Sequence, residues 1–314
     1  MYVKLEIQIR RSPATDAAYT AAVDILAHDI QALNGFLRDF PRLVILTGAG
    51  VSADSGIPTY RDADGRWLHS EPIRHNDFIS RAQTRRRYWA RSWHGWPAVR
   101  DAVPNAAHKA LAALENAGHI ELLITQNVDR LHQRAGSRRV VDLHGRLDRV
   151  RCLDCDQPQH REKVQALLAR DNHWQRVDAG NARPDGDRDI DEGQAAGVAL
   201  PRCEACAGDL KPDVVFFGAN IPAERLQTCS AALERADGLL AVGTSLQVFS
   251  GFRLCRSVHR SGRPVAIINP GTTRADDLAV LKLRSPAGAL LAAVVQALPT
   301  RAINHRPSAL DNPS

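Results

Sequence analysis

The stretch RLVILTGAGVSADSGIPTYR, residues 42–61, decides the fold of this 314-residue chain. Its first part is a short run of Leu, Val and Ile without polar alternation, which is typical of a parallel strand covered on both faces. The run leads into GAGVSA (48–53), which matches the G-x-G-x-x-A turn whose backbone N–H groups face a pyrophosphate. A turn that needs glycine only for its backbone would look the same, so the turn alone leaves both interpretations open.

Short apolar runs of the same kind recur along the chain, and helical stretches lie between several of them. This alternation predicts an α/β fold with a doubly wound, Rossmann-like parallel sheet. The runs are residues 121–125, 140–143, 213–217, 238–243 and 264–269, and the helical stretches are residues 106–117, 222–236 and 251–261.

Four of the six cysteines form two Cys-x-x-Cys pairs, Cys152 with Cys155 and Cys203 with Cys206. Each pair can hold one side of a tetrahedral Zn²⁺, and four thiolates leave no open position, so the metal would be structural. Cys229 and Cys255 have no such partners and are expected to be small core residues.

Two inserts interrupt the predicted sheet. A helical insert at about 60–104 holds four of the five tryptophans, and the cysteine pairs lie in a second insert with a polar, Gly-rich middle. The expected division is a helical lead-in over 1–42, a dinucleotide-binding domain over 43–145 and 213–300, a zinc-binding domain over 146–212 and a flexible tail over 301–314. The four tryptophans are Trp67, Trp89, Trp93 and Trp96.

Polar residues follow two of the predicted strands where each strand ends. Residues 126–129 (QNVD) follow one run and His144 follows another. Ligands of open parallel sheets lie at the carboxyl ends of the strands, so these amide and carboxylate groups can meet ribose hydroxyls and a carboxamide. His144 can serve there as a general base near neutral pH, although a purely structural histidine fits the sequence about equally well.

Several classes of protein are disfavoured. The glycine turn runs into SGIPTYRDADGRW rather than a second strand ending in an acidic residue, which argues against a dehydrogenase. The net charge of +6 fits an anionic ligand, but no basic and aromatic surface near the cysteines indicates a nucleic-acid partner. No run of about 18 apolar residues or secretory signal is present, so we expect a cytoplasmic protein without a membrane segment.

Taken together, these motifs resemble those of the sirtuins, which are NAD-dependent protein deacylases. Further strings resemble the class II branch, among them YWAR (88–91), RCLDC (151–155), RPDGD (183–187) and DDLAVLKL (276–283). The family-level strings are GAGVSADSGIPTYR (48–61), TQNVDRLH (125–132), LHG (143–145), KPDVVFFG (211–218), GTSLQV (243–248), IIN (267–269) and the four cysteines.

The resemblance implies NAD and Zn as cofactors and assigns residues to NAD. The pyrophosphate would meet Gly48, Ala49, Gly50 and Ser52; the nicotinamide would meet Ile57, Pro58, Asn127 and Asp129; its ribose would meet Gln126 and Arg61. The adenosine end would meet Gly243, Thr244, Ser245, Asn269 and the loop around Ala287, and Tyr60, Val128, Pro270 and Gly271 complete the set.

The same resemblance implies a reaction in which an acyl-lysine displaces nicotinamide, and the products are free lysine and O-acyl-ADP-ribose. His144 would be the general base and Asn127 the second catalytic residue. Mono-ADP-ribosylation of a protein needs no other residues and stays open as an alternative. Ser250 departs from the family pattern, where Pro is frequent at this position.

The acylated protein substrate would bind as an added strand along Phe217, Gly218, Gln247 and Val248. Tyr88 and Arg91 resemble a Tyr-x-x-Arg pair that binds succinyl or glutaryl groups, although an exposed helix face with abundant arginine explains them as well. We expect the protein to be a monomer.

Overall fold

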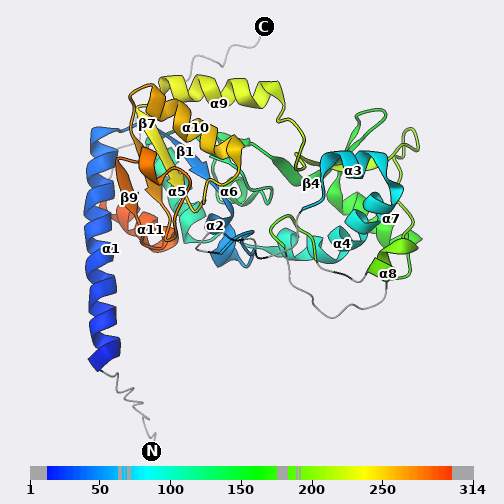
Figure 1. Ribbon diagram of the computed structural model, residues 1–314, viewed down its shortest axis with the longest axis horizontal. Coiled ribbons are helices and arrows are strands. Elements are labelled where there is room, and N and C mark those ends of the chain that lie inside the picture. Colours follow the sequence, from blue (N-terminus) through cyan, green and yellow to red (C-terminus); the bar gives the residue numbers. More distant parts are fainter. Residues whose placement is uncertain are drawn as a thin grey trace, which may run out of the picture.

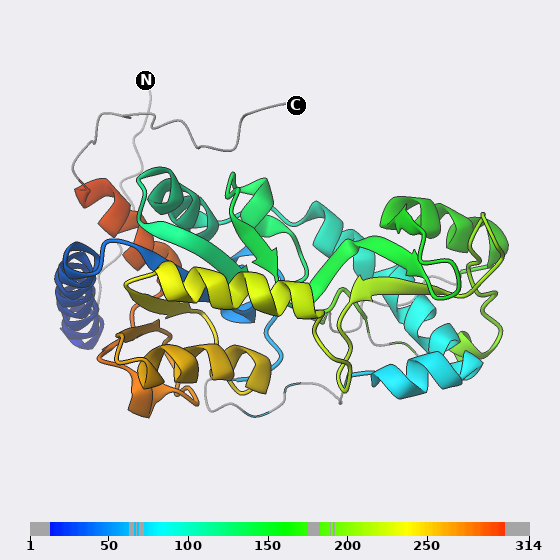
Figure 2. The ribbon, with the colours of Figure 1, turned by 90° about the horizontal axis from the view of Figure 1, so that it is seen from above.

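The computed structural model describes residues 13–298 except 63–65, 67, 69–71, 175–182, 189 and 191, with only the backbone described for 13–22, 192 and 194. Trp67 and the predicted tail over 301–314 lie outside the described residues. The described chain forms two lobes that lie side by side (Figures 1 and 2).

The larger lobe is built on a parallel sheet of six strands in the order β3-β2-β1-β7-β8-β9 (Figure 1). All five strand pairs are parallel, which confirms the predicted doubly wound sheet. The strands are β1 (Leu43–Thr47), β2 (Ile120–Thr125), β3 (Val140–Asp142), β7 (Gly238–Val242), β8 (Val265–Ile268) and β9 (Leu281–Leu283).

Helices cover both faces of this sheet. On β1, Leu43 and Ile45 join one apolar core, while Val44 and Leu46 join the other, so every residue of the strand is buried. This two-sided burial is the reason the strand sequence lacks polar alternation. The first core packs on α1 (Pro13–Asp39), α5 (Ala106–Asn116) and α11 (Ala287–Ala297), and the second on α9 (Ala223–Arg235) and α10 (Phe249–Arg260).

Helix α1 runs along the edge of the larger lobe (Figure 1). Leu33, Phe36 and Leu37 pack into the first core. The Asp29 carboxylate accepts hydrogen bonds from the backbone N–H groups of Arg284 (3.2 Å) and Ser285 (3.0 Å), and these contacts lower the pKa of Asp29 against the opposing effect of its burial. Apolar packing and the hydrogen bonds of Asp29 thus hold the helix against the larger lobe.

The smaller lobe contains a three-stranded antiparallel sheet in the order β5-β4-β6, and β4 runs from the larger lobe into it (Figure 2). Phe78, Trp89 and Val150 belong to its apolar core. The elements are β4 (Gly145–Cys152), β5 (Pro158–His160), β6 (Leu210–Val214), α3 (His75–Ser80), α4 (Ala82–Asp101), α7 (Arg161–Asp171) and α8 (Glu192–Ala196).

The apolar run at 213–217 behaves differently from the prediction. It is not a strand of the large parallel sheet, because β6 pairs antiparallel with β4 in the smaller lobe. The burial pattern of β6 explains this, since Leu210 and Pro212 are buried while Lys211 and Asp213 are only partly buried, as expected for a half-buried strand. The remaining short elements are α2 (Ala49–Ser52), α6 (Leu131–Arg134) and two 3₁₀ turns, η1 (Ala53–Ser55) and η2 (Asp276–Leu278).

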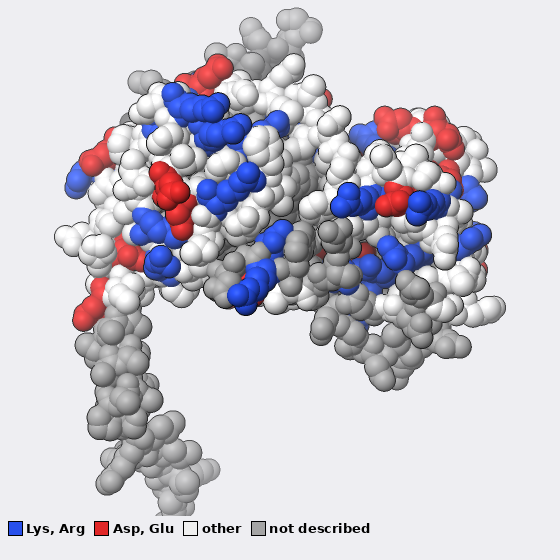
Figure 3. Space-filling model, in the orientation of Figure 1, with Lys and Arg blue, Asp and Glu red and all other residues white. Residues whose placement is uncertain are grey.

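The surface of both lobes is charged but mixed. Figure 3 shows basic and acidic side chains interspersed over the face that it presents. Among the described residues, no helix is both long enough and apolar enough to cross a membrane.

Candidate active site

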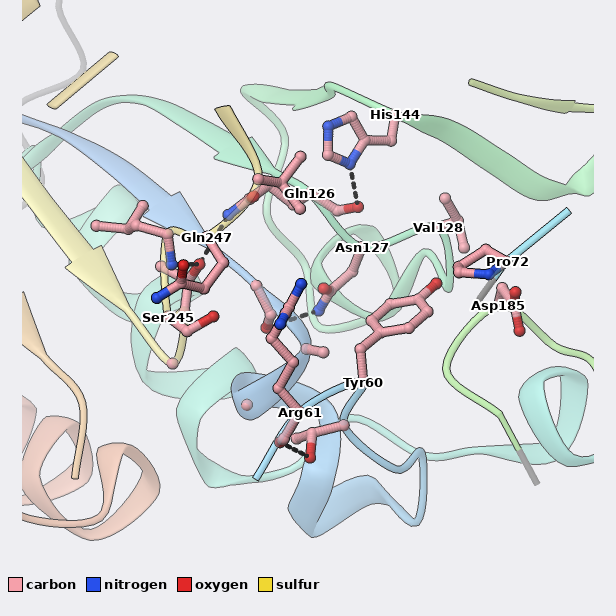
Figure 4. Close-up of a pocket in the computed structure, with 18 of the residues that line it drawn as sticks. Tyr60, Arg61, Pro72, Gln126, Asn127, Val128, His144, Asp185, Ser245 and Gln247 are labelled. Carbon is pink, nitrogen blue, oxygen red and sulfur yellow. Dashed lines mark hydrogen bonds between the residues drawn. The ribbon is translucent and has the colours of Figure 1, made fainter. Parts of the chain in front are cut away.

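A cavity of about 670 Å³ opens where the two lobes meet, at the carboxyl ends of the parallel strands. Gly48 follows β1, Gln126 follows β2, Gly243 follows β7 and Asn269 follows β8, and all four line the cavity. His144, two residues after β3, also lines it (Figure 4). The sheet therefore brings together strand-end residues that are far apart in the sequence.

Most residues predicted to contact a cofactor line this cavity, and four lie behind it. Ser52, Ile57 and Asp129 are buried and Pro58 is partly buried, and these four are not among the lining residues. The lining residues of the predicted set are Gly48, Ala49, Gly50, Tyr60, Arg61, Gln126, Asn127, Val128, Gly243, Thr244, Ser245, Asn269, Pro270, Gly271 and Ala287.

The two glycine turns after β1 and β7 pack against each other through their backbones. The N–H of Gly50 donates to the carbonyl oxygen of Gly243 at 2.9 Å. A Cβ atom on Gly50 would lie 2.8 Å from that oxygen, and one on Gly48 would lie 2.7 Å from the Cβ of Thr244. Glycine is therefore required for the packing of the turns as well as for any close approach of a phosphate.

Asn127, Ser52 and Asp129 form a hydrogen-bonded chain below the first turn. The Asn127 Nδ2 donates to Gly48 O and to Ser52 Oγ, both at 3.0 Å, and Ser52 Oγ donates to Asp129 Oδ2 at 2.7 Å. Burial raises the pKa of Asp129, although hydrogen bonds from Leu131 and Ser52 oppose this effect. The chain fixes the Asn127 amide so that its Oδ1 is the atom left for a ligand.

His144 is held in one tautomer. Its Nδ1 lies 3.1 Å from the carbonyl oxygen of Gln126, and because a carbonyl only accepts, Nδ1 carries the proton. Its Nε2 is therefore an acceptor, and Ser250 Oγ donates to it at 2.8 Å. Burial lowers the pKa of His144 to about 4, and the charge of Arg225 acts in the same direction. The ring is thus neutral at pH 7 and presents a basic nitrogen.

Ser250 is a functional candidate that the reasoning from sequence did not assign. It lines the cavity and contacts the basic nitrogen of His144. The signal was present, because serine stands at a position where the sirtuin pattern frequently has proline, which has no side-chain donor.

The four cysteines meet in the smaller lobe. Their sulfur atoms all lie within 4.8 Å of one another, with Cys152 Sγ 3.5 Å from Cys206 Sγ and Cys155 Sγ 3.7 Å from Cys203 Sγ. A disulfide needs sulfurs at about 2.05 Å, whereas a tetrahedral zinc with Zn–S bonds of about 2.3 Å separates its sulfurs by about 3.8 Å. The donor set and spacing fit Zn²⁺. Cys229 and Cys255 are buried in the core, as expected.

Of the residues predicted to meet a protein substrate, all but Arg91 line the cavity. Phe217, Gly218, Gln247 and Val248 line the cavity, and Phe217 and Val248 are exposed. Tyr88 also lines it, but Arg91 does not, and both side chains are buried on α4. The alternative of an exposed helix face is therefore wrong.

Comparisons with known proteins agree with this geometry. Residues 48–250 match the Sir2 family. Two relatives named "NAD-dependent protein deacetylase" are similar: one from Xanthomonas campestris pv. campestris (strain 8004), 52% identical over 84% of this chain and 90% of that protein, and one from Bordetella bronchiseptica, 50% identical over 87% and 100%.

A solved structure described as "Sir2-p53 peptide-NAD+" has a TM-score of 0.69 and 30% identity, covering 85% of this chain and 97% of the other. The family match spans most of the chain, and the relatives are aligned over nearly their whole length. The chain belongs to the Sir2 family, the sirtuins.

Proposed function

We propose that this protein removes acyl groups from lysine side chains of other proteins, with NAD as co-substrate. The observation that carries the proposal is the neutral imidazole of His144, whose acceptor nitrogen faces the same cavity as the glycine turns. The two relatives named "NAD-dependent protein deacetylase" support it.

NAD fits the residues of the cavity. When bound, it supplies an activated ribose carbon and a hydroxyl that receive the acyl group. We propose that Gly48, Ala49 and Gly50 hold its pyrophosphate, and that the fixed amide of Asn127 orients the nicotinamide. Ser52 and Asp129 act behind this amide and position it. The other lining residues of the predicted set, from Tyr60 to Ala287, complete the contacts.

We propose that His144 is the general base. Its Nε2 takes up a proton from a hydroxyl, while Nδ1 stays bonded to Gln126 and keeps the ring in place. The Ser250 hydroxyl occupies Nε2 in this structure, so Ser250 has to turn away when a ligand hydroxyl arrives.

We also propose the finer assignments. They are that the chain belongs to the class II branch, that it acts as a cytoplasmic monomer, and that it divides into the domains predicted above. An acylated peptide would add along Phe217–Gly218 and Gln247–Val248, and all four of these residues line the cavity. The four cysteines would hold a structural zinc that supports the smaller lobe.

The test is to incubate the protein with NAD and an acetyl-lysine peptide, and to follow peptide, nicotinamide and acyl-ADP-ribose by mass spectrometry. Equal amounts of free lysine and acyl-ADP-ribose are expected, and His144→Ala should abolish both. The exposed His173→Ala is a matched control with full activity. Transfer of ADP-ribose to protein without loss of acyl groups would support the transferase alternative, and full activity of His144→Ala would refute the assignment.

A further inference from the structure

One segment of the smaller lobe, residues 183–187 (RPDGD), reaches the cavity. Its turn is closed by hydrogen bonds from Arg183 N to Asp187 O (2.9 Å) and from Gly186 N to Arg183 O (3.2 Å). The turn packs tightly on α4, because a Cβ atom on Gly95 would lie 2.3 Å from Gly186 O. The position of Asp185 and Asp187 is therefore set by backbone packing.

Both carboxylates of this turn line the cavity, together with Tyr60 and Tyr88. Figure 4 shows Asp185 on the side of Pro72, across the cavity from Ser245 and Gln247. We call Ile73, Tyr88, Leu147, Asp185 and Asp187 the inner end. It combines apolar walls with acidic acceptors.

Two polar groups of the inner end have no hydrogen-bond partner within the part of the chain that the structure describes. They are the Tyr88 hydroxyl, on a residue that is 3% exposed, and Asp185 Oδ1. Buried polar groups are normally paired, and these two lie on residues that line the cavity, where a ligand group can reach them. Burial and the neighbouring Asp187 raise the pKa of Tyr88, which keeps its hydroxyl protonated.

The cations near this end do not line the cavity, and these include Arg161, which is buried and interacts electrostatically with Tyr88 and Asp187. Arg91 is 7% exposed and pairs with Asp187, with Nη2 3.4 Å from Oδ2, and neither Arg91 nor Arg183 lines the cavity. Arg61, the one Lys or Arg among the described lining residues, extends toward Asn127 (Figure 4). A ligand therefore meets carboxylates first, and the positive charge of Arg91 is already neutralised.

We infer that the inner end selects the acyl group: it takes an uncharged acyl chain whose far end carries N–H or O–H donors, and it rejects one that ends in a carboxylate. Asp185 accepts from the donor, and Asp187 withholds Arg91 from acidic chains. This inference rests on the proposed deacylase function. It is opposite to the carboxylate binding that Tyr88 and Arg91 suggest by their spacing alone.

A pair of probes of equal size tests the inference. Succinyl-lysine ends in a carboxylate, and succinamoyl-lysine replaces it with a primary amide. With the full-length protein and NAD, kcat/KM for the amide is expected to exceed that for the acid by at least about ten-fold, because the acid places like charges together and no Lys or Arg lines the inner end. A ratio below about ten, or a preference for the acid, would overturn the inference.

Three variants locate the effect. Asp185→Asn removes the acceptor charge, and Asp187→Asn releases Arg91; in both, the amide-to-acid ratio is expected to fall toward one. The control is Asp171→Asn, a carboxylate at the end of α7 that does not line the cavity, and its ratio should match that of the wild type. If the amide-to-acid ratio of kcat/KM is unchanged in both inner-end variants, the roles of Asp185 and Asp187 are refuted. If a variant does not fold, the ratio measured for the wild type still tests the inference.

The inference and the proposed function fail separately. Turnover of an acetyl-lysine peptide tests the function, whereas fluorescence anisotropy measures binding of the two matched peptides without turnover. An acetyl peptide that is not deacylated would refute the function, and the binding ratio would still decide the selectivity. An acetyl peptide that is deacylated, with equal binding of acid and amide, would refute only the inference.

Discussion

The buried histidine pair below the parallel sheet makes a quantitative prediction about acid stability. His108 is completely buried, and its Nδ1 accepts from the N–H of Asn105 at 3.3 Å, which caps α5. Its ring centroid lies 4.7 Å from that of His132, whose Nε2 bonds Thr47 Oγ1 at 2.9 Å. Burial lowers the pKa of His108 to about 4 and lowers that of His132 as well.

The sign of the effect follows from proton binding. The folded pKa of His108 is depressed from 6.5 to about 4, so the unfolded chain binds the proton first as the pH falls. The stability is fully present above pH 6.5 and is lost as the pH falls toward 4. At 1.36 kcal/mol per pH unit, the loss between pH 7.5 and 5.0 is about 2 kcal/mol for this residue.

The perturbation is His108→Asn, whose carboxamide oxygen can replace Nδ1 as the acceptor for Asn105. We expect the free energy of unfolding of the variant to fall between pH 7.5 and 5.0 by about 2 kcal/mol less than that of the wild type. The substitution also acts through His132. The charge of a protonated His108 lowers the pKa of His132, so without it His132 is protonated more readily in the folded protein, and the variant loses still less stability at low pH.

The assay is urea denaturation followed by circular dichroism at both pH values. The comparison uses only the pH-dependent change, so a variant that is less stable at both pH values still tests the reasoning. The exposed His173→Asn is the control, with the pH dependence of the wild type. The reasoning is refuted if His108→Asn loses as much stability on acidification as the wild type.

Three further predictions concern the site and its supports. Gly50→Ala should lower the free energy of unfolding by about 1–3 kcal/mol even without NAD, because its Cβ would lie 2.8 Å from Gly243 O. Thermal unfolding measures this, and the control is Gly197→Ala, whose Cβ would meet no atom within 4 Å. Chelation of zinc should unfold the smaller lobe and lower stability by several kcal/mol, and metal analysis should find one zinc per chain; a chelated protein with unchanged circular dichroism would contradict this. Ser250→Ala should move the acidic limb of kcat/KM to higher pH by about 0.7 pH unit, since the lost hydrogen bond favours neutral His144; an unchanged limb would show that the bond does not act on the ring.

Short stretches of sequence predicted the parallel strands of the larger lobe. A strand covered on both faces needs apolar residues at every position, and residues 43–47 carry that requirement in the sequence itself. The glycine turn and the two Cys-x-x-Cys pairs are equally local signals, and the four cysteines do meet within 4.8 Å. In each case the chemistry of neighbouring residues limits the choice of structure.

The contacts that give the cavity its chemistry were decided by the tertiary structure. Ser250 reaches His144 across 106 positions, and Arg91 is neutralised by Asp187, which belongs to a different insert of the chain. The run at 213–217 looked like its neighbours, yet β6 at its start pairs antiparallel in the smaller lobe. The sequence determined which elements form, because burial patterns are local, while the partner of each charge and each basic nitrogen depended on how distant elements pack.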